Sequence, residues 1–437
     1  MKGVALGFAV IIGIILFFLL NPRFLYNIII ALYHTAIKIS SLWNKKSKLW
    51  VGGRRNIFQE LANNFSFPDH KKIWIHCASL GEFEQGRPVI EKIRQNYPEH
   101  KILLTFFSPS GYEVRKNYDV ADHVAYLPID TKKNARKFIE IIRPDIAIFV
   151  KYEFWVHYIE TLYKQKIPVL LISAIFTKKM IFFKWYGKLF RNLLRKFTFI
   201  FVQEENSFDL LKKIKLTEVE IAHDTRFDRV TAIASAHVEN PILKNFAEGF
   251  NVMVAGSTWA ADEKLLKHAF YHNLVYNNFK LIVAPHNVSK KDIRKASKKF
   301  KKYSVLYSQI ENVADTTNNS RVLIIDNIGM LSSLYKYADV CYVGGGFKKG
   351  IHNILEAAVY GKPIFFGPKY KKAAEAHGLI KAGAAFSVSD ADNLLKDMEF
   401  LGGFDAVYKG ACRNAAKYVS DRCGGSEKVL EKIRIYL

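Results

Sequence analysis

The chain has 437 residues, which favours two or three domains over one. Its formal net charge of +25 indicates a polyanionic partner, such as nucleic acid, anionic lipid headgroups or a phosphorylated substrate. The four cysteines form no CxxC pair and are too scattered for a zinc signature, so we expect reduced, cytoplasmic thiols.

The amino terminus carries the strongest compositional signal. Residues 3–20 are uncharged and almost wholly apolar, and the run is just long enough to cross a bilayer core of roughly 30 Å. A signal peptide is the alternative, but no small-x-small cleavage site follows. Basic residues are concentrated on the carboxyl side of the run, so the positive-inside rule predicts a cytoplasmic catalytic part. We therefore expect residues 1–50 to be a retained membrane-anchor helix, spanning or lying in the membrane, with its juxtamembrane segment.

After this segment, short apolar runs alternate with amphipathic stretches, a pattern typical of βα units and parallel sheets. The first set of predicted strands comprises 73–79, 101–108, 123–128, 145–150, 169–174, 199–203 and 219–222. The second set comprises 252–257, 279–285, 305–308, 321–326, 340–345, 363–368 and 386–389. Residues 237–249 have few strand formers and contain Pro241, so we place a hinge there. The predicted fold class is α/β, with doubly wound domains at 51–236 and 237–437.

Residues 73–88 read as a strand, a tight loop of small residues and a helix. In open α/β sheets such a loop lies at the carboxyl end of the strands, where ligands bind. Glu82 is therefore predicted to face a cleft just past a strand end. Spacing alone allows the alternative that Glu82 only caps its own helix.

A second carboxylate, Glu356, follows a glycine-rich turn in the carboxyl-terminal half. Residues 344–358 predict a loop that lets the backbone approach a ligand, and then a helix near Asn353 whose free N–H groups face a phosphate. Glu356 is placed to accept hydrogen bonds from a ribose diol, and the strand at 361–368 is expected to return to the same cleft. The alternative is an ordinary loop and capped helix.

Residues 176–197 mix aromatic side chains with Lys and Arg and contain no acid. That composition is typical of a segment resting on an anionic membrane surface. The alternative is a core helix with a solvated basic face.

The motifs at 79–82, 352–358 and 361–368 together resemble the 3-deoxy-D-manno-octulosonic acid (Kdo) transferases of lipopolysaccharide synthesis, in family order and spacing over nearly the whole chain. The resemblance implies a GT-B fold of two facing Rossmann-like domains, with acceptor binding in 51–236 and donor binding in 237–437. It also implies CMP-Kdo as donor, a lipid A precursor as acceptor, inversion at the anomeric carbon, and an enzyme on the cytoplasmic face of the inner membrane.

The resemblance assigns the general base to Glu82. The positions that it implies for CMP binding are Ser257, Thr258, Pro285, His286, Gly329, Met330, Leu331, Asn353, Ile354, Leu355 and Glu356. Four places depart from the family pattern, one of which is residues 223–228, where the usual leading glycine is missing. Lys151 replaces the first acid of a Glu-x-Glu-x-Trp motif, so only Glu153 carries over, as an acceptor-binding residue. His286 stands where many members have arginine, and Met330 where several have glutamate.

Arg87 and Ser110, near two predicted strand ends, are candidates to bind the acceptor's phosphates, although Arg87 also suits an ordinary surface position. A single-displacement mechanism needs one carboxylate base, and we expect neither a cofactor nor a metal. Two alternatives stay open. One is another membrane-associated GT-B transferase that uses a UDP-sugar. The other is a membrane-tethered nucleic-acid binder, but no RNA-binding motif or helix-turn-helix is present, so no nucleic-acid partner is expected.

Overall fold

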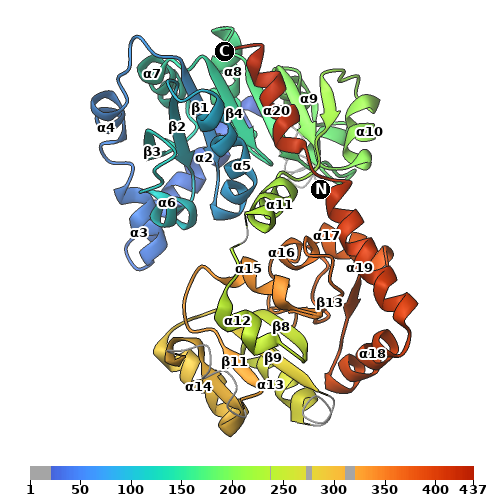
Figure 1. The fold of residues 1–437 in the computed structure, drawn as a ribbon. Helices are drawn as coiled ribbons and strands as arrows, with labels where there is room; N and C mark the ends of the chain where they lie inside the picture. The colour runs from blue at the N-terminus through green and yellow to red at the C-terminus, as the bar shows by residue number, and fades with distance from the viewer. Residues whose placement is uncertain (1–20, 237, 272–277, 311–319) are drawn as a thin grey trace, which may run out of the picture. The chain divides into compact units, whose positions relative to one another are not determined.

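The structure is a computed structural model that describes residues 21–236, 238–271, 278–310 and 320–437 (Figure 1). Contacts divide the chain into two compact units. The first comprises Met1–Arg226 and Gly424–Leu437, and the second comprises Phe227–Cys423. Each unit is built on a seven-stranded sheet, and every strand pair in both sheets is parallel.

The first sheet has the order β3-β2-β1-β4-β5-β6-β7. Its strands are β1 (Lys72–Cys77), β2 (Lys101–Phe106), β3 (His123–Tyr126), β4 (Ile146–Val150), β5 (Val169–Ala174), β6 (Phe199–Val202) and β7 (Val219–Ile221). The helices of this unit are α2 (Pro22–Ser40), α3 (Lys45–Gly52), α4 (Ile57–Asn64), α5 (Leu80–Asn96), α6 (Pro109–Arg115), α7 (Lys132–Ile142), α8 (Val156–Lys164), α9 (Lys188–Leu194), α10 (Glu205–Lys213) and α20 (Gly425–Arg434).

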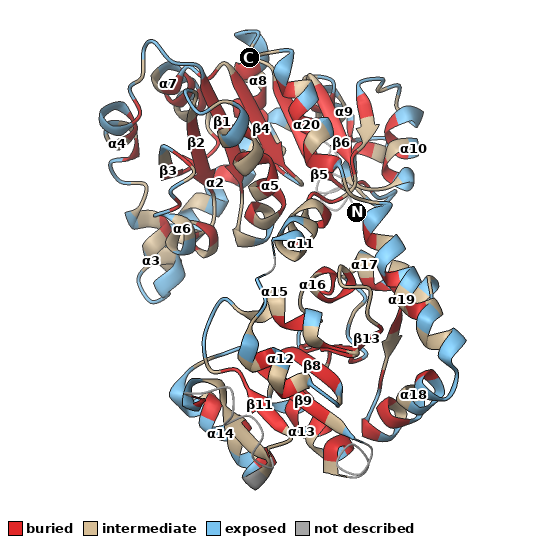
Figure 2. Ribbon diagram, in the orientation of Figure 1, coloured by how far each residue is buried: buried red, intermediate tan, exposed pale blue. Residues whose placement is uncertain are grey.

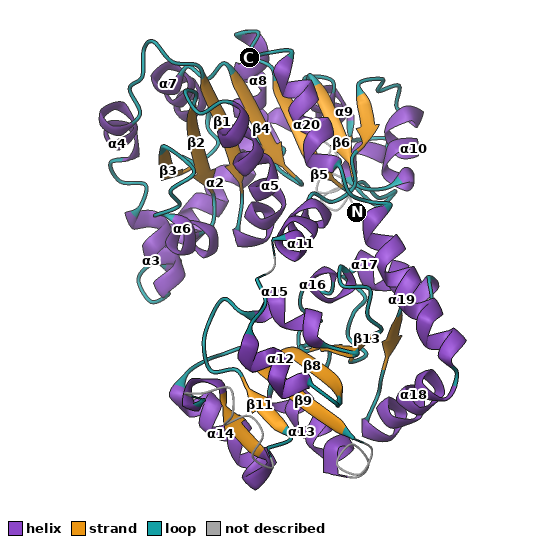
Figure 3. Ribbon diagram, in the orientation of Figure 1, coloured by secondary structure: helices purple, strands orange, loops and turns teal. Residues whose placement is uncertain are grey.

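Helices cover both faces of the first sheet (Figure 3). One apolar core lies between the sheet and α5 with α20, and the other lies between the sheet and α4, α7, α8, α9 and α10. Successive side chains of β1 alternate between these cores, since Ile73 and Ile75 join the first and Trp74 joins the second. Both faces of the strand are therefore buried, as Figure 2 shows, which explains its nearly continuous apolar sequence.

The second sheet has the order β10-β11-β9-β8-β12-β13-β14. Its strands are β8 (Asn251–Thr258), β9 (Phe279–Pro285), β10 (Ser304–Leu306), β11 (Val322–Ile324), β12 (Val340–Val343), β13 (Ile364–Phe366) and β14 (Ala385–Ser387). Its helices are α12 (Pro241–Ala247), α13 (Ala260–Ala269), α14 (Lys290–Phe300), α15 (Leu331–Leu334), α16 (Leu355–Ala358), α17 (Ala374–Lys381), α18 (Ala391–Gly403) and α19 (Asp405–Ser420). Helices α13, α14 and α18 cover one face, and α12, α16, α17 and α19 contribute to the core on the other.

The α/β class and all the predicted strands are confirmed, with ends that differ by a few residues. The units divide between residues 226 and 227 rather than 236 and 237. Helix α11 (Arg226–Ser235) belongs mostly to the second unit, because Phe227 and Val230 pack into a core of that unit. Helix α20 returns to the first unit, where it packs against α5 and Lys92 pairs with Glu427 at 2.6 Å. Figure 1 shows this red helix among the blue and green elements.

The predicted anchor at residues 3–20 lies outside the described residues. Within the described part of the chain, no single helix is both long and apolar enough to cross a membrane. Helices α2 and α3 satisfy the length and hydropathy requirement only as a pair, and they are bent by 118° where they meet.

The basic, aromatic segment 176–197 is not one helix. It contains a short 3₁₀ turn (Ile181–Phe183) and α9. Phe176 and Phe182 are buried in the core of the first unit that also contains Trp74, whereas Trp185 is 79% exposed. The segment therefore combines core packing with an exposed aromatic and basic surface.

Arg54 fastens α3 to the ends of two strands. Its guanidinium donates hydrogen bonds to the carbonyls of Trp50 (3.0 Å), Phe107 (2.7 Å) and Leu127 (2.8 Å). It also lies over the rings of Trp50 and Tyr126, at 3.8 and 4.6 Å from their centroids. Burial lowers the pKa of Arg54 to about 9, because it disfavours the charged form of the guanidinium.

We predict that Arg54→Lys destabilises the first unit, because one ammonium cannot donate to three divergent carbonyls or stack on the rings. The free energy of unfolding should fall by about 2–4 kcal/mol in chemical denaturation. Arg55→Lys is the matched control, since Arg55 is exposed. Equal stability of the two variants would contradict the role given to Arg54.

Candidate active site

The strand order of the first sheet reverses between β1 and β4. Strand β1 pairs with β2 on one side and β4 on the other, so the chain leaves the two central strands in opposite directions. Ligands of open α/β sheets bind in the crevice that such a reversal leaves at the carboxyl ends of the strands. Two predicted site residues, Glu82 and Glu153, follow β1 and β4 at this point.

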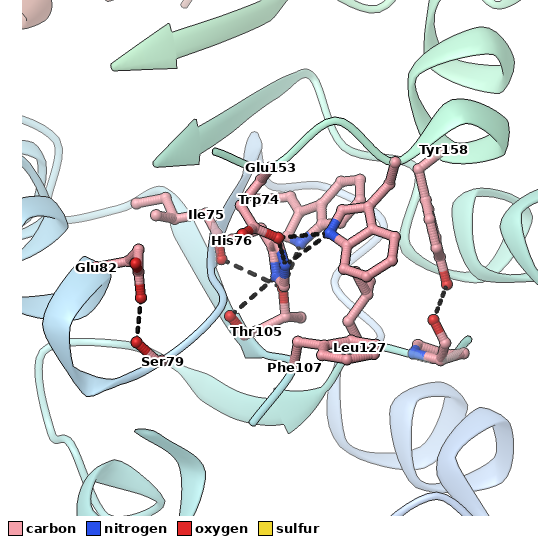
Figure 4. Close-up of polar contacts among 12 residues, drawn as sticks. Trp74, Ile75, His76, Ser79, Glu82, Thr105, Phe107, Leu127, Glu153 and Tyr158 are labelled. Atoms are coloured by element: carbon pink, nitrogen blue, oxygen red, sulfur yellow. Dashed lines mark hydrogen bonds and ion pairs between the residues drawn. The ribbon is translucent and has the colours of Figure 1, made fainter. Parts of the chain in front are cut away.

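Glu82 lies in the first turn of α5, directly after the strand-to-helix loop. Ser79 is the N-cap of the helix: its hydroxyl oxygen accepts from the Gly81 N–H at 3.3 Å, and its hydroxyl donates to the Glu82 carboxylate (Figure 4). The described residues contain no return bond from the Ser79 backbone N–H to Glu82, as a capping box would require. Glu82 remains partly exposed, so its carboxylate is oriented and still accessible.

Glu153 is buried beside His76 and Trp155. His76 Nε2 lies 3.0 Å from Glu153 Oε2, and Trp155 Nε1–H donates to the same oxygen at 2.6 Å (Figure 4). Sequence reasoning missed His76. The available signal was a histidine in an otherwise apolar central strand. The two ring nitrogens of a buried histidine require hydrogen-bond partners.

The carboxylates of Glu82 and Glu153 both affect the pKa of Cys77. Burial raises the pKa of the Cys77 thiol well above its ordinary value, and the charges of Glu82 and Glu153 raise it further. Cys77 is therefore a protonated, inert thiol between two acidic groups rather than a nucleophile.

Arg87 and Ser110 make local contacts. Arg87 Nε–H donates to Glu91 at 2.6 Å, one turn along α5. The hydroxyls of Ser110 and Ser108 are 3.0 Å apart at the start of α6, where Ser108 is the N-cap. Their predicted contact with acceptor phosphates stays a prediction, and Arg87 would have to exchange its bond to Glu91 for it.

In the second unit, the strand order reverses between β8 and β12. The predicted donor-binding residues follow the carboxyl ends of four neighbouring strands, β11, β9, β8 and β12. Ser257 and Thr258 end β8; Pro285 and His286 end β9; Gly329, Met330 and Leu331 follow β11; Asn353, Ile354, Leu355 and Glu356 follow β12. The fold thus brings all eleven positions to one edge of one sheet.

The glycine-rich loop after β12 is held by a buried carboxylate. Asp262 accepts hydrogen bonds from the N–H groups of Gly345 (3.0 Å) and Trp259 (2.8 Å) and from the hydroxyl of Tyr342 (3.0 Å). Gly345 has a φ of +97°, and a Cβ atom there would lie 2.5 Å from the carbonyl oxygen of Gly350. Sequence reasoning missed Asp262, although an acid three residues into a helix is a capping signal.

Three rings stack beside this loop. Trp259 Nε1–H donates to His352 Nε2 at 2.9 Å, and the two rings are inclined by only 15°. His286 lies over both, at 4.6 Å from the Trp259 centroid and 4.3 Å from that of His352. His286, predicted as a departure from the family arginine, is therefore part of an aromatic stack that includes two residues outside the predicted set.

Glu356 lies in α16, a helix of one turn that begins at Leu355, two residues after Asn353, near which it was expected to start. Asn353 Nδ2–H donates to Glu356 Oε1 at 2.9 Å and orients the carboxylate. A four-residue helix has too small a dipole to hold a phosphate by itself. The loop glycines and side chains must supply that binding instead.

We predict an acid-dependent loss of stability that depends on His352. Burial, with a smaller contribution from His286, lowers the pKa of His352 to about 4, so the folded state binds its proton more weakly than the unfolded state, in which the pKa is about 6.5. The stabilisation is present above pH 6.5 and is lost as the pH falls toward 4. His352→Gln should reduce this loss by about 1 kcal/mol at pH 5, a value reduced for solvent screening. The exposed His377→Gln serves as control, and identical pH profiles for wild type and His352→Gln would contradict the assignment.

Comparison with known proteins finds similarity to Kdo transferases. Residues 54–229 match the family model of 3-deoxy-D-manno-octulosonic-acid transferase (kdotransferase). The 3-deoxy-D-manno-octulosonic acid transferase of Aquifex aeolicus is 28% identical over 75% of this chain and 85% of its own length. A bifunctional glycosyltransferase/methyltransferase of Fusobacterium nucleatum is 25% identical over 79% of this chain, which spans only 55% of that protein.

Among solved structures, UDP-GlcNAc 2-epimerase from Neisseria meningitidis superposes with a TM-score of 0.57 at 16% identity, covering 83% of this chain and 99% of its own. That likeness shows the shared GT-B-like fold. The family model and the Kdo transferase relatives go further, and together they support a glycosyltransferase similar to the Kdo transferases.

Proposed function

We propose that this protein transfers Kdo from CMP-Kdo to a lipid A precursor, with inversion at the anomeric carbon, during lipopolysaccharide core synthesis. The observation that carries the proposal is the position of Glu82. It lies after β1, at the strand-order reversal, inside the region that matches the family model. Its carboxylate is oriented by Ser79 and remains partly exposed.

The proposed chemistry needs one base and stabilisation of one leaving group. Glu82 removes the proton of the acceptor hydroxyl as that oxygen attacks the anomeric carbon of Kdo. The bond from this carbon to the CMP phosphate breaks in the same displacement, so no covalent enzyme intermediate forms. Loop N–H groups and polar side chains at the carboxyl edge of the second sheet stabilise the departing phosphate.

The donor nucleotide is assigned to the edge formed by the ends of β8, β9, β11 and β12. Ser257 and Thr258 approach its phosphate, and Glu356 accepts hydrogen bonds from the ribose hydroxyls. Support comes from the close approach of backbone in this region, because a Cβ atom at Gly344 or Gly346 would lie within 2.6 Å of backbone atoms. On the other unit, Arg87 and Ser110 are assigned to acceptor phosphates and Glu153 to an acceptor hydroxyl.

We place the enzyme at the cytoplasmic face of the inner membrane. Exposed apolar side chains of the first unit support this location: Leu42 is 82% and Trp43 is 73% exposed in the turn after α2, and Trp185 protrudes from the basic segment 176–197. Aromatic and basic side chains together favour the headgroup region of an anionic bilayer. The apolar run at residues 3–20 is the assigned membrane anchor.

Glu82→Gln tests the catalytic assignment, because the amide keeps the size of the side chain but cannot accept a proton. Turnover with CMP-Kdo should fall by roughly 10²–10⁴, while donor binding stays unchanged. Glu84→Gln, in the same helix, is the matched control and should keep most of the activity. Turnover near that of wild type in folded Glu82→Gln would remove Glu82 from the mechanism.

Glu356→Ala tests the donor assignment. Loss of the carboxylate leaves the ribose hydroxyls without an acceptor, so the donor KM should rise by about 10- to 100-fold with little change in the acceptor KM. Asp405→Ala is the control, since Asp405 is exposed at the start of α19. An unchanged donor KM would exclude this contact.

A further inference from the structure

Six hydrogen-bond contacts connect Trp74, His76 and Thr105, on β1 and β2, with Glu153 and Trp155 after β4 (Figure 4), and one of them joins Trp155 Nε1–H to His76 Nε2 at 3.2 Å. Trp74 Nε1–H donates to Thr105 Oγ1 at 2.8 Å, and the Thr105 hydroxyl oxygen lies 2.9 Å from His76 Nδ1. His76 Nδ1 is also 3.1 Å from the Thr105 carbonyl oxygen. The remaining two bonds join His76 Nε2 and Trp155 Nε1 to Glu153 Oε2. His76 and Thr105 are fully buried, so no water competes for these groups.

The chemistry of the donors gives this chain of bonds a direction. An indole N–H can only donate, so Thr105 Oγ1 accepts from Trp74 and has its own proton left to donate. Its nearest acceptor is His76 Nδ1 at 2.9 Å, since the carbonyl of Ile75 is farther, at 3.4 Å. With Nδ1 as acceptor, the single proton of the neutral ring is on Nε2, from which it is donated to Glu153.

The opposite tautomer conflicts with the geometry. A proton on Nδ1 could be donated to the Thr105 carbonyl, and Nε2 could then accept from Trp155 Nε1–H at 3.2 Å. Nε2 would, however, also direct its lone pair at the closer carboxylate oxygen of Glu153, 3.0 Å away. That contact is repulsive unless the ring takes up a second proton. The direction from Trp74 through Thr105 and His76 to Glu153 gives the Nε2 proton a carboxylate acceptor at 3.0 Å, and it leaves Trp155 Nε1–H with the nearer of its two neighbours, Glu153 Oε2 at 2.6 Å rather than His76 Nε2 at 3.2 Å.

The end of the chain is the carboxylate at the strand-order reversal. Glu153 Oε2 receives His76 and Trp155, whereas Oε1 has no hydrogen bond within the described residues. The side chain is 8% exposed, so its orientation depends on these two donors. Glu153 follows β4 and Glu82 follows the adjacent β1.

We propose that His76 is a positioning residue. As the Nε2–H tautomer, set by Thr105 and Trp74, it holds Glu153 turned so that Oε1 accepts a hydrogen bond from a sugar hydroxyl of the acceptor. His76 itself touches no substrate. This inference rests on the proposed function, because it assigns Glu153 to the acceptor of that reaction.

Thr105→Val and Thr105→Ser test the proposal without changing a substrate contact. Removal of the hydroxyl leaves the backbone carbonyl of position 105 as the only partner of Nδ1, so the ring proton should move from Nε2 to Nδ1. The tautomer is read from ¹⁵N chemical shifts of the full-length protein labelled on histidine, with His76→Gln used for assignment. Thr105→Val should raise the acceptor KM or lower kcat by about tenfold, with the donor KM unchanged, and Thr105→Ser should restore both tautomer and kinetics.

Thr161→Val controls for the loss of a threonine hydroxyl elsewhere in this unit, because among the described residues that hydroxyl bonds only the carbonyl of His157. The proposal is overturned if Nδ1 of wild-type His76 is protonated at neutral pH. It is equally overturned if folded Thr105→Val keeps wild-type acceptor kinetics, or if Thr105→Ser behaves like Thr105→Val. Wild-type protein that transfers no Kdo would contradict the proposed function instead, and the tautomer in substrate-free protein would still test the chain of bonds.

Discussion

The reversal of strand order in each parallel sheet is the constraint on which the rest of the structure depends. Right-handed crossovers carry the chain away from the central pair of strands on opposite sides, so the loops after those strands diverge. In the first unit the pair is β1 and β4, and in the second it is β8 and β12. The predicted base Glu82 and the loop that contains Gly345 both lie beside such a pair.

Buried polar groups keep these loops in place at the strand ends. Asp262 binds two backbone N–H groups and one hydroxyl, Arg54 binds three backbone carbonyls, and Glu153 binds two side-chain donors. Each group would be costly to bury without partners, so each loop has one favoured arrangement. These hydrogen bonds also orient neighbouring side chains that reach solvent. The packed α/β scaffold thereby holds candidate site residues in place at the carboxyl ends of the strands.

The sequence predicted the sheets well because both faces of parallel strands are buried, which produces short, continuous apolar runs. It predicted less well which core a helix joins. Helices α11 and α20 are amphipathic, and their sequences suit packing against either unit. The packing of Phe227 places α11 in the second unit, and the contact with α5 places α20 in the first. Single polar residues were also missed. The pattern around His76 does not indicate that it will bond Glu153, and the pattern around Trp259 does not indicate that it will bond His352. In both pairs the partners are remote in sequence.

The proposed function depends on which sugar the protein transfers and from which donor. The most direct measurement incubates the purified protein with a detergent-dispersed lipid A precursor and either CMP-Kdo or a panel of UDP-sugars, and analyses the products by mass spectrometry. We expect Kdo addition and stoichiometric release of CMP with CMP-Kdo, and no product with any UDP-sugar. Transfer from a UDP-sugar, with none from CMP-Kdo, would contradict the proposed function.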